Sequence, residues 1–265
     1  PQTTSGFLER NGLQVAVNGG FFHPWFSKGP LWYYPHRGDP VVLVDARGNG
    51  GGNEAWPVRW LQGLTGKRAE SVFYFSELQS QTTLIGRANV MAYLYERYPK
   101  TPSYRQEAER HTRLAQAYEE GTYAPNWTGA RDPWLATIPN DTTLVLAMNE
   151  YVASSGEGLI MRASRFENVV VVGENSRGCL TFGNAGLYQL PHSRMLVYLP
   201  INFGLYPDLE FREARGLAPD LWVPAADAVN YAVAALRAGT LSTERSLSPE
   251  QVQEPFLPED TRARA

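Results

Sequence analysis

Two polar segments follow buried strands and contain the residue types that hydrolytic chemistry needs. The first follows a strand expected over 41–45 and contains Asp45, Arg47 and the glycines of 48–52. These glycines let the backbone turn sharply and present N–H groups to a ligand. The second is Ala-Ser-Ser-Gly-Glu over 153–157, at the start of an expected helix. There the hydroxyl of Ser154 would lie on a strand-to-helix turn, next to free N–H groups that can stabilise an oxyanion.

Ser154 also has a second interpretation. Ser154 and Glu157 form the Ser-x-x-Glu pattern of a capping box, in which the serine caps the helix and the glutamate bonds back to it. Caps are far commoner than nucleophiles, and a nucleophilic serine needs a base to take its proton. Because the spacing supplies no base, the residues alone favour the cap.

Buried strands and amphipathic helices alternate around these segments. Runs rich in Val and Leu predict strands buried on both faces over 41–45, 143–148 and 168–173. Shorter strands are expected over 71–75, 186–190 and 195–199, and helices over 53–63, 84–98, 103–120, 155–164 and 227–237. This alternation predicts an α/β protein with a largely parallel sheet.

The composition permits one sizeable domain and excludes several classes of function. Of the 265 residues, 43% are hydrophobic, which is enough for a substantial core. The net charge of −3 gives no electrostatic reason to expect nucleic acid or an anionic membrane as partner. The single cysteine, Cys179, excludes an internal disulfide framework and a cysteine-rich metal site. No apolar run is long enough to span a bilayer.

Four motifs follow one another over about residues 41–237. They are Val44-Asp-Ala-Arg-Gly-Asn-Gly-Gly51, Val152-Ala-Ser-Ser-Gly-Glu157, Val172-Gly-Glu-Asn-Ser-Arg-Gly178 and Gly216-Leu-Ala-Pro-Asp-Leu-Trp-Val223. Together, in this order, they resemble the S41 serine peptidases, which include the tail-specific or C-terminal-processing proteases and their tricorn-core relatives. Four motifs in order are far more specific than any one of them.

The resemblance implies a ClpP/crotonase-like core with a mostly parallel sheet and flanking helices. It places the nucleophile at Ser154, three residues before Glu157, which becomes a supporting candidate. It places the oxyanion-hole donors at the N–H groups of Gly51 and Ser155, with Gly52 as a second supporting candidate. The implied partner is a peptide or protein substrate, hydrolysed without a metal or other cofactor. Family members are frequently exported or associated with the cell envelope.

The general base is where this sequence departs from the tail-specific proteases. Cys179 stands where that branch has its lysine base, and a neutral thiol is a poor base for serine. None of Lys28, Lys67 and Lys100 lies in a matching motif. The alternative to an active peptidase is therefore an S41-like peptide-binding domain that has lost turnover.

The tricorn-like branch uses a histidine instead, upstream of the first motif. His23 and His36 lie upstream, but their surroundings do not match that branch. His111 is interpreted as a solvated surface residue in a charged helix, and His192 as a structural residue in a turn. The acidic member of that branch has weak matches in Glu210 and Glu213.

The N-terminal residues carry a separate resemblance. The segments Val15-Ala-Val-Asn-Gly-Gly-Phe-Phe-His-Pro24 and Tyr34-Pro-His-Arg-Gly-Asp-Pro-Val41 resemble the start of a phosphodiester glycosidase domain. The match covers a small part of that domain, so a complete active site for sugar phosphodiester hydrolysis is not expected. The strand expected over 13–17 either pairs on an edge of the sheet or belongs to a fusion remnant. We expect three regions: an N-terminal segment over 1–40, a peptidase domain over 41–237 and a disordered tail over 238–265.

Overall fold

The computed structural model describes residues 15–17, 41–118, 126–127 and 136–241. The contacts divide the chain into two compact units. The first comprises Pro1–Val72, Trp134–Leu180 and Arg212–Ala265, and the second comprises Phe73–Pro133 and Thr181–Phe211. All four motifs lie in the first unit. The peptidase domain expected over 41–237 includes residues of both units.

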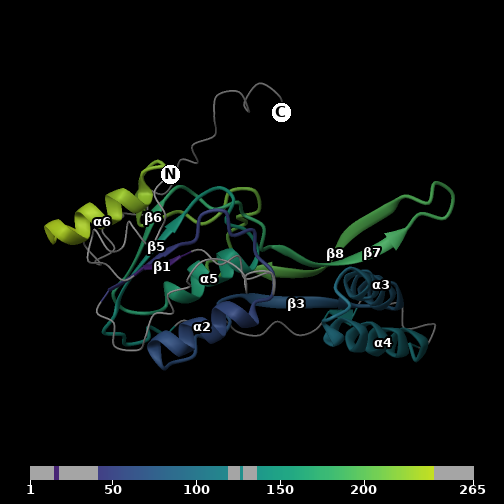
Figure 1. Cartoon of the computed structure of the whole chain (residues 1–265). Helices are drawn as coiled ribbons and strands as arrows, with labels where there is room; N and C mark the ends of the chain where they lie inside the picture. The colour runs from purple at the N-terminus through teal and green to yellow at the C-terminus, as the bar shows by residue number, and fades with distance from the viewer. Residues whose placement is uncertain (1–14, 18–40, 119–125, 128–135, 242–265) are drawn as a thin grey trace, which may run out of the picture. The chain divides into compact units, whose positions relative to one another are not determined.

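A five-stranded sheet forms the centre of the first unit (Figure 1). Its strands, in spatial order, are β1 (Val15–Val17), β2 (Val41–Asp45), β5 (Thr143–Met148), β6 (Val169–Gly173) and β9 (Leu221–Trp222). All neighbouring strands are parallel. The strand expected over 13–17 is observed as β1, which pairs with β2 at one edge of the sheet.

Helices cover this sheet and explain why its strands are apolar on both faces. The helix α6 (Ala228–Ala238) packs on alternate strand residues, among them Leu43, Val145 and Val170. The helices α2 (Ala55–Thr65) and α5 (Ser155–Ala163) contact each other and lie on the opposite side in Figure 1. The expected α/β class, with a mostly parallel sheet and flanking helices, is confirmed.

The second unit contains an antiparallel sheet and two helices. The sheet order is β4 (Asn126–Trp127), β3 (Tyr74–Gln79), β8 (Leu196–Leu205) and β7 (Phe182–Gln189). The helix α3 (Gln81–Arg97) packs on β7 and on α4 (Pro102–Gln116), around a small core of Val90, Met91 and Leu187. No helix among the described residues has the length and apolar character needed to cross a membrane.

Two expectations for the second unit are corrected. The short strands expected over 186–190 and 195–199 are the parts of β7 and β8 next to their turn, and the hairpin is longer than expected because the pairing continues to Phe182 and Phe203. The surface assignment of His111 is wrong: the residue is only 7% exposed. Its Nδ1 donates to the carbonyl of Glu107 at 2.8 Å, which satisfies the ring inside the helix pair.

Candidate active site

Ser154 occupies a strained turn between β5 and α5. Its φ of 51° and ψ of −124° lie in a region that a non-glycine residue enters only at an energetic cost of about 1–3 kcal/mol. The residue is half-buried and stands at the N-cap position of α5. A strained strand-to-helix turn of this kind is also how the nucleophile elbow of α/β-hydrolases exposes its serine.

The capping interpretation of Ser154 holds only in part. Ser154 and Glu157 are arranged as a capping box, and the carboxylate of Glu157 accepts the N–H of Ser154 at 3.0 Å. The Ser154 side chain, however, makes no cap hydrogen bond. The bond from the Ser154 N–H to the Glu157 carboxylate ties this turn to the helix.

Glu157 is fully buried and receives four hydrogen bonds. Besides Ser154, the backbone N–H groups of Gly178 and Cys179 donate to its carboxylate at 2.8 and 2.9 Å, and the hydroxyl of Ser176 donates at 2.6 Å. Burial raises the pKa of the Glu157 carboxyl above its ordinary value, and the four donors oppose that rise. The carboxylate joins the start of α5 to the loop after β6.

Ser176 extends this connection to the fourth motif. Its hydroxyl donates to Glu157 and accepts the N–H of Leu217 at 2.7 Å. Its backbone N–H in turn donates to the carbonyl of Leu217 at 3.0 Å. Three of the four motifs are therefore linked through one buried hydroxyl. Ser176 was not predicted from the sequence, and its place inside the third motif was the only signal for it.

The turns after β2 and β5 run side by side and bring the first and second motifs together. The N–H of Ala46 donates to the carbonyl oxygen of Ala147 at 2.9 Å, and the N–H of Ala153 donates to the backbone carbonyl oxygen of Asn49 at 3.0 Å. Gly51 lies directly against Ser154: a Cβ built on Gly51 would stand 2.5 Å from the Ser154 Cβ. Only glycine fits here, both for lack of space and because its φ is 102°.

The backbone donors around Ser154 are not equally available. The N–H of Gly51 donates to Oδ1 of Asn49 at 3.1 Å, and Asn49 is itself buried. Among the described residues, the N–H groups of Ser155 and Gly52 have no acceptor. The Ser155 hydroxyl is also buried without a partner there. Asn49 was missed by sequence reasoning, although Asn before a glycine run is a common signal for a side chain that bonds its own turn.

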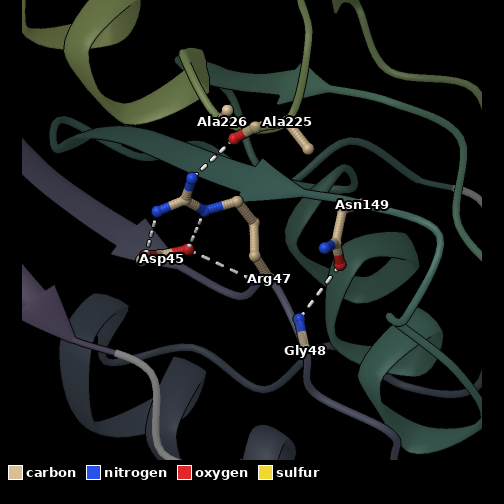
Figure 2. A pocket seen from close by; sticks show the side chains of 6 residues that line it. All are labelled: Asp45, Arg47, Gly48, Asn149, Ala225 and Ala226. Carbon is tan, nitrogen blue, oxygen red and sulfur yellow. Dashed lines mark hydrogen bonds and ion pairs between the residues drawn. The ribbon is translucent and has the colours of Figure 1, made fainter.

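Asp45 and Arg47 form an ion pair that holds the first turn. Arg47 Nε and Nη2 donate to the two carboxylate oxygens of Asp45, each at 2.7 Å. Arg47 Nη1 donates to the carbonyl of Ala225 at 2.5 Å. These two side chains line a shallow depression, together with Gly48 and Asn149 (Figure 2).

The described residues offer no clear base for Ser154. The N–H groups of Cys179 and Ser154 bind the same oxygen of Glu157, so the two residues are close neighbours. Burial, and then the charge of Glu157, raise the pKa of the Cys179 thiol, which therefore stays protonated at neutral pH. The amine of Lys67 donates to the carbonyl of Pro139 at 3.0 Å. No cluster of metal-binding side chains occurs in the described ranges.

The remaining candidates lie elsewhere. His23, His36 and Lys28 are outside the described residues. His192 is exposed in the turn between β7 and β8 of the second unit, and Glu210 is exposed in the same unit. Glu213 is half-buried in the first unit, and its charge contributes to the raised pKa of the Cys179 thiol.

No protein-family model and no curated protein matches the sequence. Comparison with solved structures finds similarity to mature CPAF, at 14% identity and a TM-score of 0.47, over 75% of this chain and 43% of that one. A putative peptidase from Parabacteroides merdae matches at 15% identity and a TM-score of 0.44, over 79% and 54% of the two chains. A putative S41 protease from Bacteroides fragilis matches at 12% identity and a TM-score of 0.40, over 76% and 46%.

The chain thus spans about half the length of the structures it matches. One of these structures is named as a putative S41 protease. Identities and TM-scores this low assign no role to any single residue. The roles of Ser154 and its neighbours therefore depend on the geometry of this chain alone.

Proposed function

We propose that this chain is a serine-type peptidase that hydrolyses peptide bonds with Ser154 as the nucleophile. The observation that carries the proposal is the strained turn of Ser154 packed against Gly51. A protein keeps a non-glycine residue in such a conformation only where the surroundings enforce it, and such residues cluster at active sites. In the reaction the Ser154 oxygen bonds to the peptide carbonyl carbon, the C–N bond breaks and the serine proton passes to the leaving amine. Water then hydrolyses the acyl ester and returns a proton to the Ser154 oxygen.

The oxyanion that forms on the carbonyl needs preorganised donors. We assign these to the backbone N–H groups of Ser155 and Gly52, which have no acceptor among the described residues. Gly51 then has a different part: its missing side chain allows the close contact, while its N–H is held by Asn49. Each oxyanion donor typically contributes about 10²–10³ in rate.

A second candidate is a peptide-binding domain without turnover. It is favoured by the absence, within the described contacts, of any titratable group bonded to the Ser154 hydroxyl. Cys179 is a close neighbour of Ser154. Its raised pKa keeps it a neutral thiol, however, and a neutral thiol is a poor acceptor for the serine proton. An enzyme and a binding domain therefore differ in one property: whether the Ser154 hydroxyl becomes acylated.

Labelling with a fluorophosphonate probe separates the two candidates. The probe should modify the wild-type chain at Ser154, and Ser154→Ala should remove both labelling and peptide hydrolysis without unfolding the chain. Ser193→Ala, in the turn between β7 and β8, is a matched Ser-to-Ala control that should label normally. Labelling that persists in Ser154→Ala would move the nucleophile elsewhere, to Ser155 first. A folded wild-type chain that never labels would favour the binding domain.

A further inference from the structure

A shallow depression of about 370 Å³ lies at the carboxyl ends of β2 and β5 (Figure 2). Its lining residues, all of the first unit, are Asp45, Arg47, Gly48, Asn149, Ala225 and Ala226. In open α/β sheets, ligands bind outside the carboxyl ends of the strands. None of these lining residues has a chemical role in the proposed reaction at Ser154.

The side chain of Asn149, which lines the depression, has a free donor. Its Oδ1 accepts the N–H groups of Gly48 at 3.0 Å and of Tyr151 at 3.2 Å. Two N–H donors on the same atom identify that atom as the oxygen, so the amide nitrogen faces the other way. Figure 2 shows this nitrogen on the side of Arg47, while the oxygen faces the N–H of Gly48. Among the described residues it has no acceptor.

The charges of the depression balance. Arg47 forms its ion pair with Asp45 inside the lining, so one positive and one negative charge cancel. A ligand carboxylate would gain little from an arginine that is already neutralised, and it would meet the Asp45 carboxylate close by. The free donor of Asn149 therefore suits a neutral acceptor such as an amide carbonyl. The small side chains of Ala225 and Ala226 leave room for a chain that runs past it.

The paired turns connect this depression to Ser154. The carbonyl of Asn149 accepts the N–H of Val152 at 2.9 Å, within the same turn that ends at Ser154. On the facing turn, Gly48 contacts Asn149 and Gly51 contacts Ser154. Asn149 and Ser154 therefore lie on the same turn and face the same neighbouring turn.

We propose that the depression is a subsite for an extended, uncharged peptide segment, and that the Asn149 side-chain amide donates to one of its main-chain carbonyls. This inference rests on the proposed function, because it supplies the substrate-binding surface of that same site. Asn149 would then determine specificity, because its amide favours an uncharged stretch of peptide over a peptide end that carries a free carboxylate.

A titration of the full chain with acetyl-tetra-alanine-amide, followed by ¹H–¹⁵N NMR, tests the subsite independently of turnover. The signals of the Asn149 side-chain amide and the Gly48 N–H should shift. Asn149→Asp keeps the oxygen that Gly48 and Tyr151 need but removes the donor, so it should weaken binding by about tenfold. Ala226→Leu, which fills the depression at an exposed position, should weaken binding as well.

Three results would overturn the subsite: no shift at Asn149, equal affinity of the wild type and Asn149→Asp, or tighter binding of the same tetrapeptide with a free carboxylate. Labelling of Ser154 by the fluorophosphonate probe is scored separately. Labelling without tetra-alanine binding would overturn the subsite and leave the proposed function standing. Tetra-alanine binding that Asn149→Asp weakens, without labelling, would support the subsite in a chain that does not turn peptides over.

Discussion

Gly51 and Ser154 are packed so closely that no side chain fits between them: a Cβ on Gly51 would lie 2.5 Å from the Ser154 Cβ and 2.5 Å from the carbonyl oxygen of Ala153. Two segments about a hundred positions apart in the sequence thus share one contact. Backbone hydrogen bonds join the two turns. Neither turn can therefore move to make room for a larger residue without breaking its bonds to the other turn.

Gly51→Ala should therefore disrupt the proposed site. The new Cβ clashes with backbone atoms, and the φ of 102° is unfavourable for alanine, so we expect a loss of about 2–4 kcal/mol in the free energy of unfolding. Urea denaturation and fluorophosphonate labelling measure the two effects. Gly50→Ala is the matched control, because a Cβ on Gly50 meets nothing within 4 Å. Equal stability of the two variants would contradict the close packing.

Glu157→Gln tests the buried carboxylate as an organiser of the turn. All four groups that bind it are donors, and a glutamine would direct its own NH₂ at some of them. We expect a cost of about 2 kcal/mol in unfolding free energy, together with reduced labelling of Ser154. Glu70→Gln, at an exposed position, should change neither property. Normal labelling in Glu157→Gln would show that the turn holds without its carboxylate.

The same carboxyl group predicts a pH dependence. Burial raises the folded-state pKa of Glu157 above its ordinary value of 4.5, so the folded chain binds this proton more readily than the unfolded chain. Its contribution to stability is therefore largest at low pH and falls as pH rises from about 4.5 through the folded-state pKa. Denaturation across this range should show the wild type losing stability relative to Glu157→Gln. The opposite slope would mean that the four donors outweigh burial.

Cys179 should react slowly with iodoacetamide at neutral pH. Burial, with the nearby Glu157 charge, raises the pKa of its thiol, and only the thiolate is alkylated. The midpoint of the rate against pH should lie above that of N-acetylcysteine. Mass spectrometry reports the reaction without ambiguity, because the chain has one cysteine. A midpoint below the reference would reopen Cys179 as a proton acceptor for Ser154.

Local patterns predicted the first unit well. The runs that form β2, β5 and β6 are apolar at nearly every position, because the sheet is covered on both faces, and they were expected almost residue for residue. The helix α5 was expected within one residue of its observed end. These features depend on neighbouring residues in the chain, which is what periodicity measures.

Features that depend on distant residues were not predicted. The hairpin of β7 and β8 was expected too short, because its pairing continues to Phe182 and Phe203, and β3, which is far away in the sequence, pairs with the same part of β8. His111 was placed at the surface because its neighbours are charged, whereas packing of α3 on α4 buries it. The hydrogen bond from the Gly51 N–H to the Asn49 side chain is a local contact that was also missed.

The Ser154 turn is held by residues from far along the chain: Gly51 before it, and Ser176 and Leu217 after it, acting through Glu157. A nascent or unfolded polypeptide lacks this arrangement and carries only an ordinary, unreactive serine. The conformation of the Ser154 turn therefore depends on completed folding of the first unit.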